Sequence, residues 1–170
     1  MKIDFSKLEI KKASPENVAE IISLLDATAK WIQSKGINQW ERGSFEEQTM
    51  LNVTDEGEVY IAIYSGVIVG TFRLQMSDEL VWGELDSEDY AYVHRLAIKP
   101  DLHGQRLGLN ILRQAEIIAR TMGKKGIRLD CMQENLALKK FYENSAGYTQ
   151  VGSAKPFGRT ARLYERQFAK

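Results

Sequence analysis

The strongest constraint on the fold lies in residues 92–108, which read YVHRLAIKPDLHGQRLG. An apolar strand there runs into Pro100 and a short turn that contains glycine, and a helix follows at once. A strand that ends at the start of a helix leaves backbone N–H groups unpaired, and the helix dipole adds a partial positive charge at the same point. Such a turn is a ready site for phosphate or pyrophosphate. The stretch therefore predicts a chain that holds a phosphorylated cofactor, and it favours an enzyme.

Composition narrows the class of protein further. The chain has 170 residues, of which 44% are hydrophobic and 27% are charged, as expected for one globular domain over residues 1–170. Its 23 basic and 23 acidic side chains cancel, so no overall charge attracts nucleic acid or an anionic membrane. The longest apolar stretch, residues 59–72, is interrupted by Ser65 and Gly66 and is too short to span a bilayer. Cys131 is the single cysteine and residues 1–12 contain no apolar h-region, so we expect a cytoplasmic protein.

Hydrophobic periodicity and turn residues predict the order of strands and helices. Ser14 and Pro15 start a first helix, and the sequence S-F-E-E at Ser44 predicts a capping box for a second. The predicted strands are residues 7–12, 58–64, 67–75, 90–98, 126–131, 147–152 and 161–168, and the later helices follow Gly108 and Asn135. We therefore expect an α/β fold with a mixed central sheet of about seven strands and about four helices. The strands on either side of the helix after Gly108 should be parallel.

Two short motifs give this order a family resemblance. The first is the turn His103-Gly104-Gln105-Arg106-Leu107-Gly108, which is similar to the loop Q/R-x-x-G-x-G/A. The second is Asn135-x6-Tyr142, followed by a glycine and an aromatic residue. With the element order, these motifs resemble the GCN5-related N-acetyltransferase (GNAT) superfamily over nearly the whole chain. The resemblance implies the GNAT (acyl-CoA N-acyltransferase) fold, with splayed fourth and fifth strands, and transfer of an acetyl group from acetyl-CoA to an amine.

The resemblance also assigns a cofactor site. The backbone of residues 103–108 would hold the pyrophosphate of acetyl-CoA, and the main chain of Leu96, Ala97 and Ile98 would pair with its pantetheine arm. Asn135 would cap its helix or bond the pantetheine. Arg106 stands where the family has a glycine, which is acceptable if its φ is negative, and its guanidinium could add a bond to phosphate. One more residue than usual separates Tyr142 from Gly147, and we expect the extra residue to form a bulged turn at the helix end.

The implied reaction needs a base for the amine and an acid for the leaving thiolate. By the resemblance, Tyr142 would face the thioester sulfur and donate the proton, although it could instead simply pack its helix on the sheet. His94 is the candidate base, because the unperturbed pKa of an imidazole is about 6.5; packing or partial exposure is the alternative. Histone-acetylating members carry a glutamate at the position of Tyr92, so that base is absent here.

The acceptor site is less defined by the sequence. Tyr92 lies on the same face of its strand as His94. Trp31 and Trp40 flank the link between the first two helices and would shape an acceptor pocket, or close the edge of the core. Glu84 belongs to an acidic connection that could attract an amine, or form a solvated loop.

Other chemistry receives little support from the sequence. Cys131 is expected to be a buried, inert thiol, and the histidines and the cysteine have no metal-ligand spacing, so no metal is expected. We expect a monomer or homodimer that acetylates a small amine. The alternatives are a non-catalytic acyl-CoA-binding or regulatory module and a protein N-terminal or lysine acetyltransferase.

Overall fold

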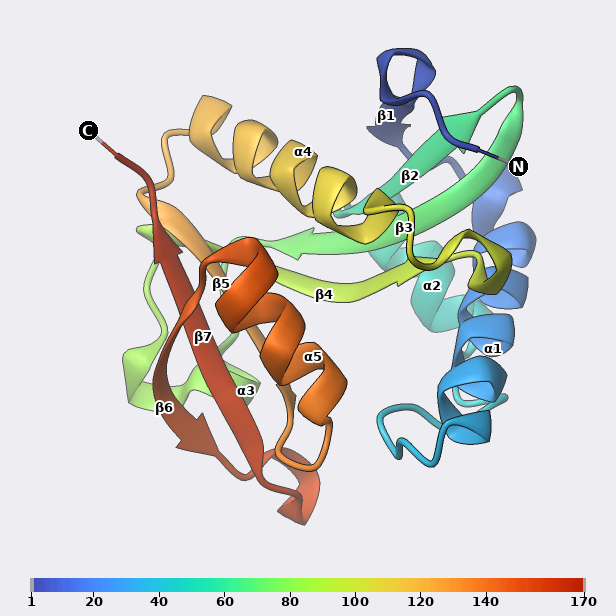
Figure 1. The fold of residues 1–170 in the computed structure, drawn as a ribbon. Helices are drawn as coiled ribbons and strands as arrows, with labels where there is room; N and C mark the ends of the chain where they lie inside the picture. The colour runs from blue at the N-terminus through green and yellow to red at the C-terminus, as the bar shows by residue number, and fades with distance from the viewer. Residues whose placement is uncertain (1, 170) are drawn as a thin grey trace.

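The computed structural model, described here for residues 2–169, contains one seven-stranded sheet in the order β1-β2-β3-β4-β5-β7-β6 (Figure 1). The strands are β1 (Glu9–Lys12), β2 (Val59–Tyr64), β3 (Val67–Gln75), β4 (Tyr90–Ile98), β5 (Gly126–Met132), β6 (Thr149–Ala154) and β7 (Ala161–Gln167). The β4–β5 pair is parallel and the other pairs are antiparallel. The predicted mixed sheet of seven strands is therefore confirmed.

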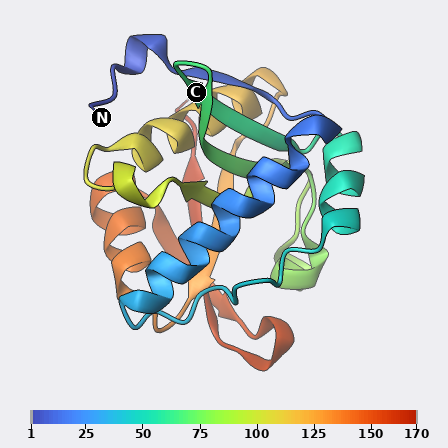
Figure 2. The same ribbon diagram turned by 90° about the vertical axis from the view of Figure 1, so that its right-hand side faces the viewer.

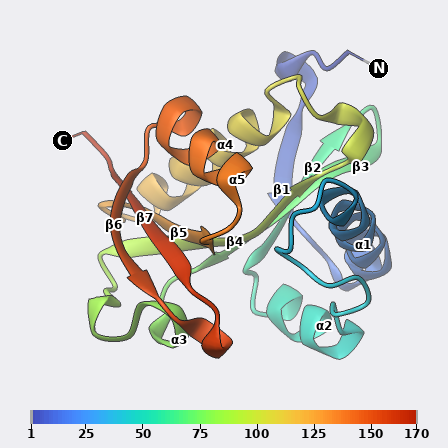
Figure 3. The same cartoon turned by 60° about the horizontal axis from the view of Figure 1, so that its bottom comes forward.

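Helices cover both faces of this sheet. They are α1 (Val18–Ser34), α2 (Glu47–Asp55), α3 (Glu79–Trp82), α4 (Leu107–Thr121) and α5 (Leu136–Lys140), and a π-helix (Phe141–Ala146) continues α5. Short 3₁₀ turns occupy Phe5–Lys7, Pro15–Asn17, Gly83–Leu85, Pro100–Leu102 and Pro156–Gly158. Figure 3 shows α4 and α5 on one face and α1, α2 and α3 on the other. None of the helices within residues 2–169 is both long and apolar enough to cross a membrane.

The core consists of two main clusters, one on each face. The larger cluster packs α4 and the π-helix against the sheet, with Ile111, Leu112 and Tyr142 among its buried members. The second cluster packs α1 and α2 against β2 and β3, with Leu25 and Met50 among its members. These clusters fix the two helical layers on the sheet, because burial of apolar surface is the main stabilising term in folding.

Strands β4 and β5 part soon after they meet. Their pairing covers only Tyr90 with Gly126, Ala91 with Ile127, and Tyr92 with Arg128. Beyond Tyr92, β4 also has a bulge against β3, where Arg95 adopts a φ of +52°. The expected splay of the fourth and fifth strands is therefore confirmed, and the second half of β4 has no β5 neighbour.

Two helices differ from the sequence prediction, one in its start and one in its existence. The capping box predicted at Ser44 is wrong, because α2 begins at Glu47 and the Ser44 hydroxyl donates to the Glu41 carbonyl instead. The acidic connection between β3 and β4 contains the short helix α3, which the sequence analysis missed. Its buried residue Trp82 packs on Tyr92, so the contact that stabilises α3 comes from β4 rather than from its own sequence.

The extra residue near the end of the fifth helix is accommodated as expected. Residues 141–146 form a π-helix, and the Tyr148 N–H donates to the Tyr142 carbonyl at 2.8 Å. Gly147 then turns the chain with a φ of +72°. A π-bulge takes up one inserted residue without breaking the helix. The bulge leaves the Tyr142 side chain packed in the core, with 5% of its surface exposed.

Candidate active site

The predicted phosphate turn lies between β4 and α4, as the sequence indicated. Arg106 is the N-cap of α4 and its side chain makes no cap hydrogen bond. The N–H groups of the first turn of α4 therefore lack a side-chain acceptor from the cap and are available to an anion. A Cβ atom at Gly104 or Gly108 would meet nothing within 4 Å, so the surface of the turn is open at both glycines.

The conformation of Arg106 differs from expectation. Its φ is +63°, in the left-handed region, and not negative as the sequence analysis required of a non-glycine residue. Gly104 precedes it with a φ of +83°. The turn thus keeps the backbone path that a glycine would adopt, at a conformational cost of about 1 kcal/mol. The turn therefore keeps a left-handed conformation at this position although the residue is an arginine.

Trp31 contacts this turn directly. Its ring stacks on His103 with the centroids 4.0 Å apart and the planes 17° from parallel. Burial lowers the pKa of His103, so the imidazole is neutral near pH 7. The structure thus places Trp31 beside the predicted cofactor turn and not beside His94. Trp40 packs edge-on against Phe45 at 5.7 Å, at the margin of the core.

Tyr142 lies on the α4–α5 face of the sheet. Burial raises the pKa of its phenol, and the nearby Cys131 and Asp130 raise it further. The phenol therefore keeps its proton at neutral pH. Within residues 2–169, no group is hydrogen bonded to the Tyr142 hydroxyl. Cys131 is fully buried, and burial raises the pKa of its thiol to about 12, in agreement with the expected inert thiol.

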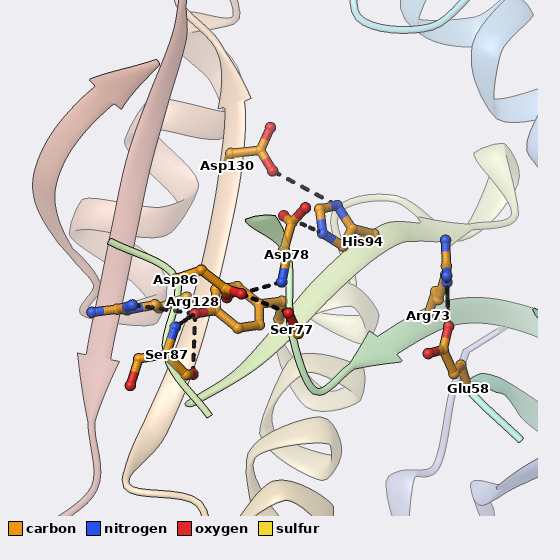
Figure 4. Close-up of polar contacts among 10 residues, drawn as sticks. Glu58, Arg73, Ser77, Asp78, Asp86, Ser87, His94, Arg128 and Asp130 are labelled. Carbon is orange, nitrogen blue, oxygen red and sulfur yellow. Dashed lines mark hydrogen bonds and ion pairs between the residues drawn. The ribbon is translucent and has the colours of Figure 1, made fainter. Parts of the chain in front are cut away.

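His94 lies on the opposite face, between two aspartates that the sequence analysis did not single out (Figure 4). Its Nε2 is 2.9 Å from Oδ2 of Asp78, and its Nδ1 is 3.7 Å from Oδ1 of Asp130. Burial raises the pKa of Asp130; the charge of His94 opposes this shift and that of Asp78 adds to it. The alternation of β5 could have indicated Asp130, because Tyr92 pairs with Arg128 and the next residues on that face are His94 and Asp130. No local signal indicated Asp78, which is the N-cap residue of the unpredicted helix α3 and makes no side-chain cap bond.

These three side chains also form a compact group of possible ligands. Each offers one atom, and the three atoms lie within 4.8 Å of one another. The spacing of the histidines and the cysteine does not indicate this group, because two of its three members are aspartates. The tertiary structure thus brings together three side chains that could bind a cation and that lie far apart in the sequence.

Two other predicted acceptor residues do not reach this group. Tyr92 is fully buried, and its hydroxyl accepts a bond from the Ser87 N–H at 2.8 Å and donates one to the Ser87 carbonyl at 3.2 Å. Its burial therefore excludes direct contact between this side chain and an acceptor. Glu84 is exposed, within the turn Gly83–Leu85. Asp86, from the same acidic connection, accepts a bond from the Asp78 N–H at 2.9 Å and so helps to fix that aspartate.

Asn135 joins the second motif to the α1–α2 connection (residues 35–46). Its Oδ1 accepts a bond from the Leu138 N–H at 3.1 Å, which caps α5 as expected. Its Nδ2 donates to Oε1 of Gln39 at 3.0 Å, and the Met132 N–H donates to the same oxygen at 3.2 Å. Figure 2 shows this connection passing beneath α1 toward the β6–β7 loop. Gln39 thus joins the connection to the last residue of β5 and to the N-cap of α5.

We expect Gln39→Leu to lower the free energy of unfolding by about 1–2 kcal/mol, since the buried Asn135 amide and the half-buried Met132 N–H lose their acceptor. Gln39→Glu is the matched control, because a carboxylate can accept both bonds. Chemical denaturation measures the stability, and trypsin cleavage after Lys35 or Arg42 measures the mobility of the connection. Equal stability and equal cleavage of both variants would contradict this role of Gln39.

Comparison with known proteins agrees with this geometry. The family model described as "Acetyltransferase (GNAT) family" matches residues 25–148. The Bacillus subtilis (strain 168) protein named "Uncharacterized N-acetyltransferase YesJ" is 32% identical over 145 residues, which cover 81% of this chain and 79% of that protein.

Among solved structures, a GNAT-family acetyltransferase from Listeria monocytogenes 4b F2365 has a TM-score of 0.79 and 23% identity, covering 95% of each chain. The PaiA N-acetyltransferase of Thermoplasma acidophilum, solved in complex with coenzyme A, has a TM-score of 0.75 and 19% identity. It covers 95% of this chain and 99% of its own. These two likenesses establish the fold, and the family match and the YesJ identity establish membership. The chain therefore belongs to the acetyltransferase (GNAT) family.

Proposed function

We propose that this protein transfers the acetyl group of acetyl-CoA to a primary amine of a small-molecule acceptor, by direct attack within a ternary complex. The observation that carries the proposal is the parting of β4 and β5 beyond Tyr92. The gap separates Tyr142 on one face of the sheet from His94 on the other. A thioester that enters between the strands would meet a proton donor on one side and a base on the other.

The cofactor would lie along the start of α4 and the second half of β4. Uncapped N–H groups at the start of α4 and the side chain of Arg106 suit a pyrophosphate. The main chain of residues 96–98 has no β5 partner and could pair with the pantetheine arm. Coenzyme A in the PaiA structure supports the choice of this carrier. We place Asn135 at the end of the arm, beside the Gln39 contact.

The chain's own groups suit the chemistry of acyl transfer. His94 removes a proton from the bound ammonium, and the neutral amine attacks the thioester carbonyl. Backbone N–H groups at the bulge of β4 stabilise the negative charge that develops on the carbonyl oxygen. Tyr142, which keeps its proton because it is buried, donates that proton to the departing thiolate. Holding both reactants in one geometry supplies much of the acceleration.

A small acceptor fits better than a protein substrate. The α1–α2 connection is held by Gln39 on one side, and Arg159 of the β6–β7 loop donates to the Asn38 carbonyl on the other. These bonds would restrict the space that an extended peptide needs. Trp40 lies in the α1–α2 connection and Glu84 in the β3–β4 connection, and we assign both supporting roles around the acceptor.

A thiol-release assay tests the proposal. The full chain is mixed with acetyl-CoA and a panel of amino acids, alkyl amines, aminoglycosides and lysine peptides, and free CoA is detected with a thiol reagent. We expect acceptor-dependent release for at least one small amine and none for the peptides. Binding of CoA without release for any amine would favour the non-catalytic module, and release with peptides alone would favour a protein acetyltransferase.

A further inference from the structure

Within residues 2–169, no hydrogen bond joins His94 to Asp130 across the gap between their side chains. Nδ1 of His94 and Oδ1 of Asp130 are 3.7 Å apart, too far for a hydrogen bond, and both side chains point toward the same space (Figure 4). We propose that this gap receives the primary ammonium group of the acceptor, held by Asp130 and deprotonated by His94, and that Asp78 is a positioning residue that orients the imidazole. This inference rests on the proposed acetyl transfer and specifies the subsite for the reacting nitrogen.

Asp78 determines which ring nitrogen is free. Its carboxylate can only accept a hydrogen bond, so the 2.9 Å contact requires a proton on Nε2 of His94. In the neutral imidazole, Nδ1 then carries the lone pair, and Nδ1 is the atom that faces Asp130. Asp78 is itself fixed, because its side chain is 6% exposed and its N–H donates to Asp86. The orientation of the ring is therefore set before any acceptor binds.

Asp130 supplies the complementary charge. Its side chain is 13% exposed, and within residues 2–169 its carboxylate accepts no hydrogen bond. Two atoms 3.7 Å apart can both lie about 3 Å from a single nitrogen, so one ammonium can bond to Asp130 and to Nδ1 at once. Burial raises the pKa of Asp130, which means that its ionised form gains from an arriving cation.

An ammonium fits this gap better than a metal ion does. Nε2 of His94 is already used in its bond to Asp78, which leaves Nδ1 and Asp130 as the free ligand atoms. A catalytic zinc site typically has about three protein ligands at about 2.0–2.3 Å, so a zinc ion would need Asp78 in addition to these two atoms. An ammonium needs only hydrogen-bond acceptors, and Nδ1 and Asp130 supply two while Asp78 keeps its bond to Nε2.

The proton balance of the reaction is complete with these groups. The ammonium gives one proton to Nδ1 of His94, which later releases it to solvent. The nitrogen then forms the new C–N bond and loses a second proton as the C–S bond breaks. Tyr142 protonates the thiolate, and the second proton restores the phenol through solvent. The products are the acetylated amine, free CoA and one released proton.

The first test is nitrogen NMR of the histidine rings in the full chain. Only two histidines are present, so a His103→Gln variant assigns both. We expect the ring of His94 to carry its proton on Nε2 in the free protein. With CoA present, n-butylamine should shift the Nδ1 signal of His94, and n-butanol, which carries no charge, should not. A proton fixed on Nδ1, or equal responses to the two probes, would overturn the proposal whether or not the protein acetylates amines.

The second test is steady-state kinetics with an acceptor that is turned over. Asp130→Asn should raise the acceptor KM about tenfold with little change in kcat, because it removes one charged hydrogen bond. Asp78→Asn should lower kcat about tenfold, because an amide can donate to Nε2 and leave the proton on Nδ1. The NMR signal of Asp78→Asn should show that exchange of protonated nitrogens, which a merely structural role would not produce. Asp89→Asn is the control, because Asp89 is half exposed and pairs with Lys125, away from His94. Equal effects of Asp130→Asn and Asp89→Asn on the acceptor KM would overturn the assignment of Asp130. Continued turnover by these variants would still support the proposed acetyl transfer.

Discussion

Tyr142→Phe is expected to reduce kcat about 100-fold, the usual contribution of one positioned acid. The phenol is buried and its pKa is raised, so it holds a proton that phenylalanine cannot provide. Stopped-flow measurement of thiol release with saturating acetyl-CoA isolates the step in which the thiolate leaves. The affinity for acetyl-CoA, measured by calorimetry, should stay within about twofold of the native value because only a hydroxyl is lost.

Stability provides the control for this variant. The Tyr142 hydroxyl has no hydrogen-bond partner within residues 2–169, and the ring keeps its contacts with Tyr148 and Tyr164. We therefore expect the free energy of unfolding to change by less than about 0.5 kcal/mol. Tyr148→Phe, which removes a bond to Glu116, should destabilise the fold without the same loss of kcat. An unchanged kcat in Tyr142→Phe would remove this residue from the mechanism and leave the cofactor site intact.

Gly108→Glu is expected to weaken CoA binding about 10- to 100-fold, because it places a negative charge beside the pyrophosphate. Gly108 lies in the first turn of α4, where the N–H groups would hold that group. The free protein should tolerate the substitution, because a Cβ atom at Gly108 meets nothing within 4 Å. A carboxylate near a helix N-terminus is even slightly favourable to the helix. Calorimetric titration with CoA and thermal unfolding of the free protein measure the two effects separately.

Gly108→Ala separates charge from crowding. It adds one methyl group in the same open space, and we expect CoA affinity within about threefold of the native value, since no charge is introduced. Salt should partly restore binding to Gly108→Glu, because added ions screen exposed charges. Unchanged affinity in the glutamate variant would show that the pyrophosphate binds elsewhere than at the start of α4.

The predicted and observed sites differ most where separate segments meet. Gln39 and Asn135 are 96 residues apart in the chain and hydrogen bonded in the fold. The sequence near either residue does not predict that contact, because it depends on how the segment after α1 packs against the end of β5. Similarly, Trp31 was expected beside the acceptor, and the packing of α1 against the turn brings it to His103 instead. The role of Tyr92 changed for the same reason, because Ser87 folds back over its hydroxyl.

The sequence by itself determined the order of strands and helices, the glycine-containing turn before α4, and the extra residue beyond Tyr142. These features arise from apolar periodicity and turn chemistry between residues close in the chain, so a short window contains the necessary information. Only the tertiary structure decided that Asp78 and Asp130 lie on either side of His94 and that Arg106 adopts a positive φ. Sheet register and the packing of loops set those features, because they bring together groups whose separation along the chain carries no local signal.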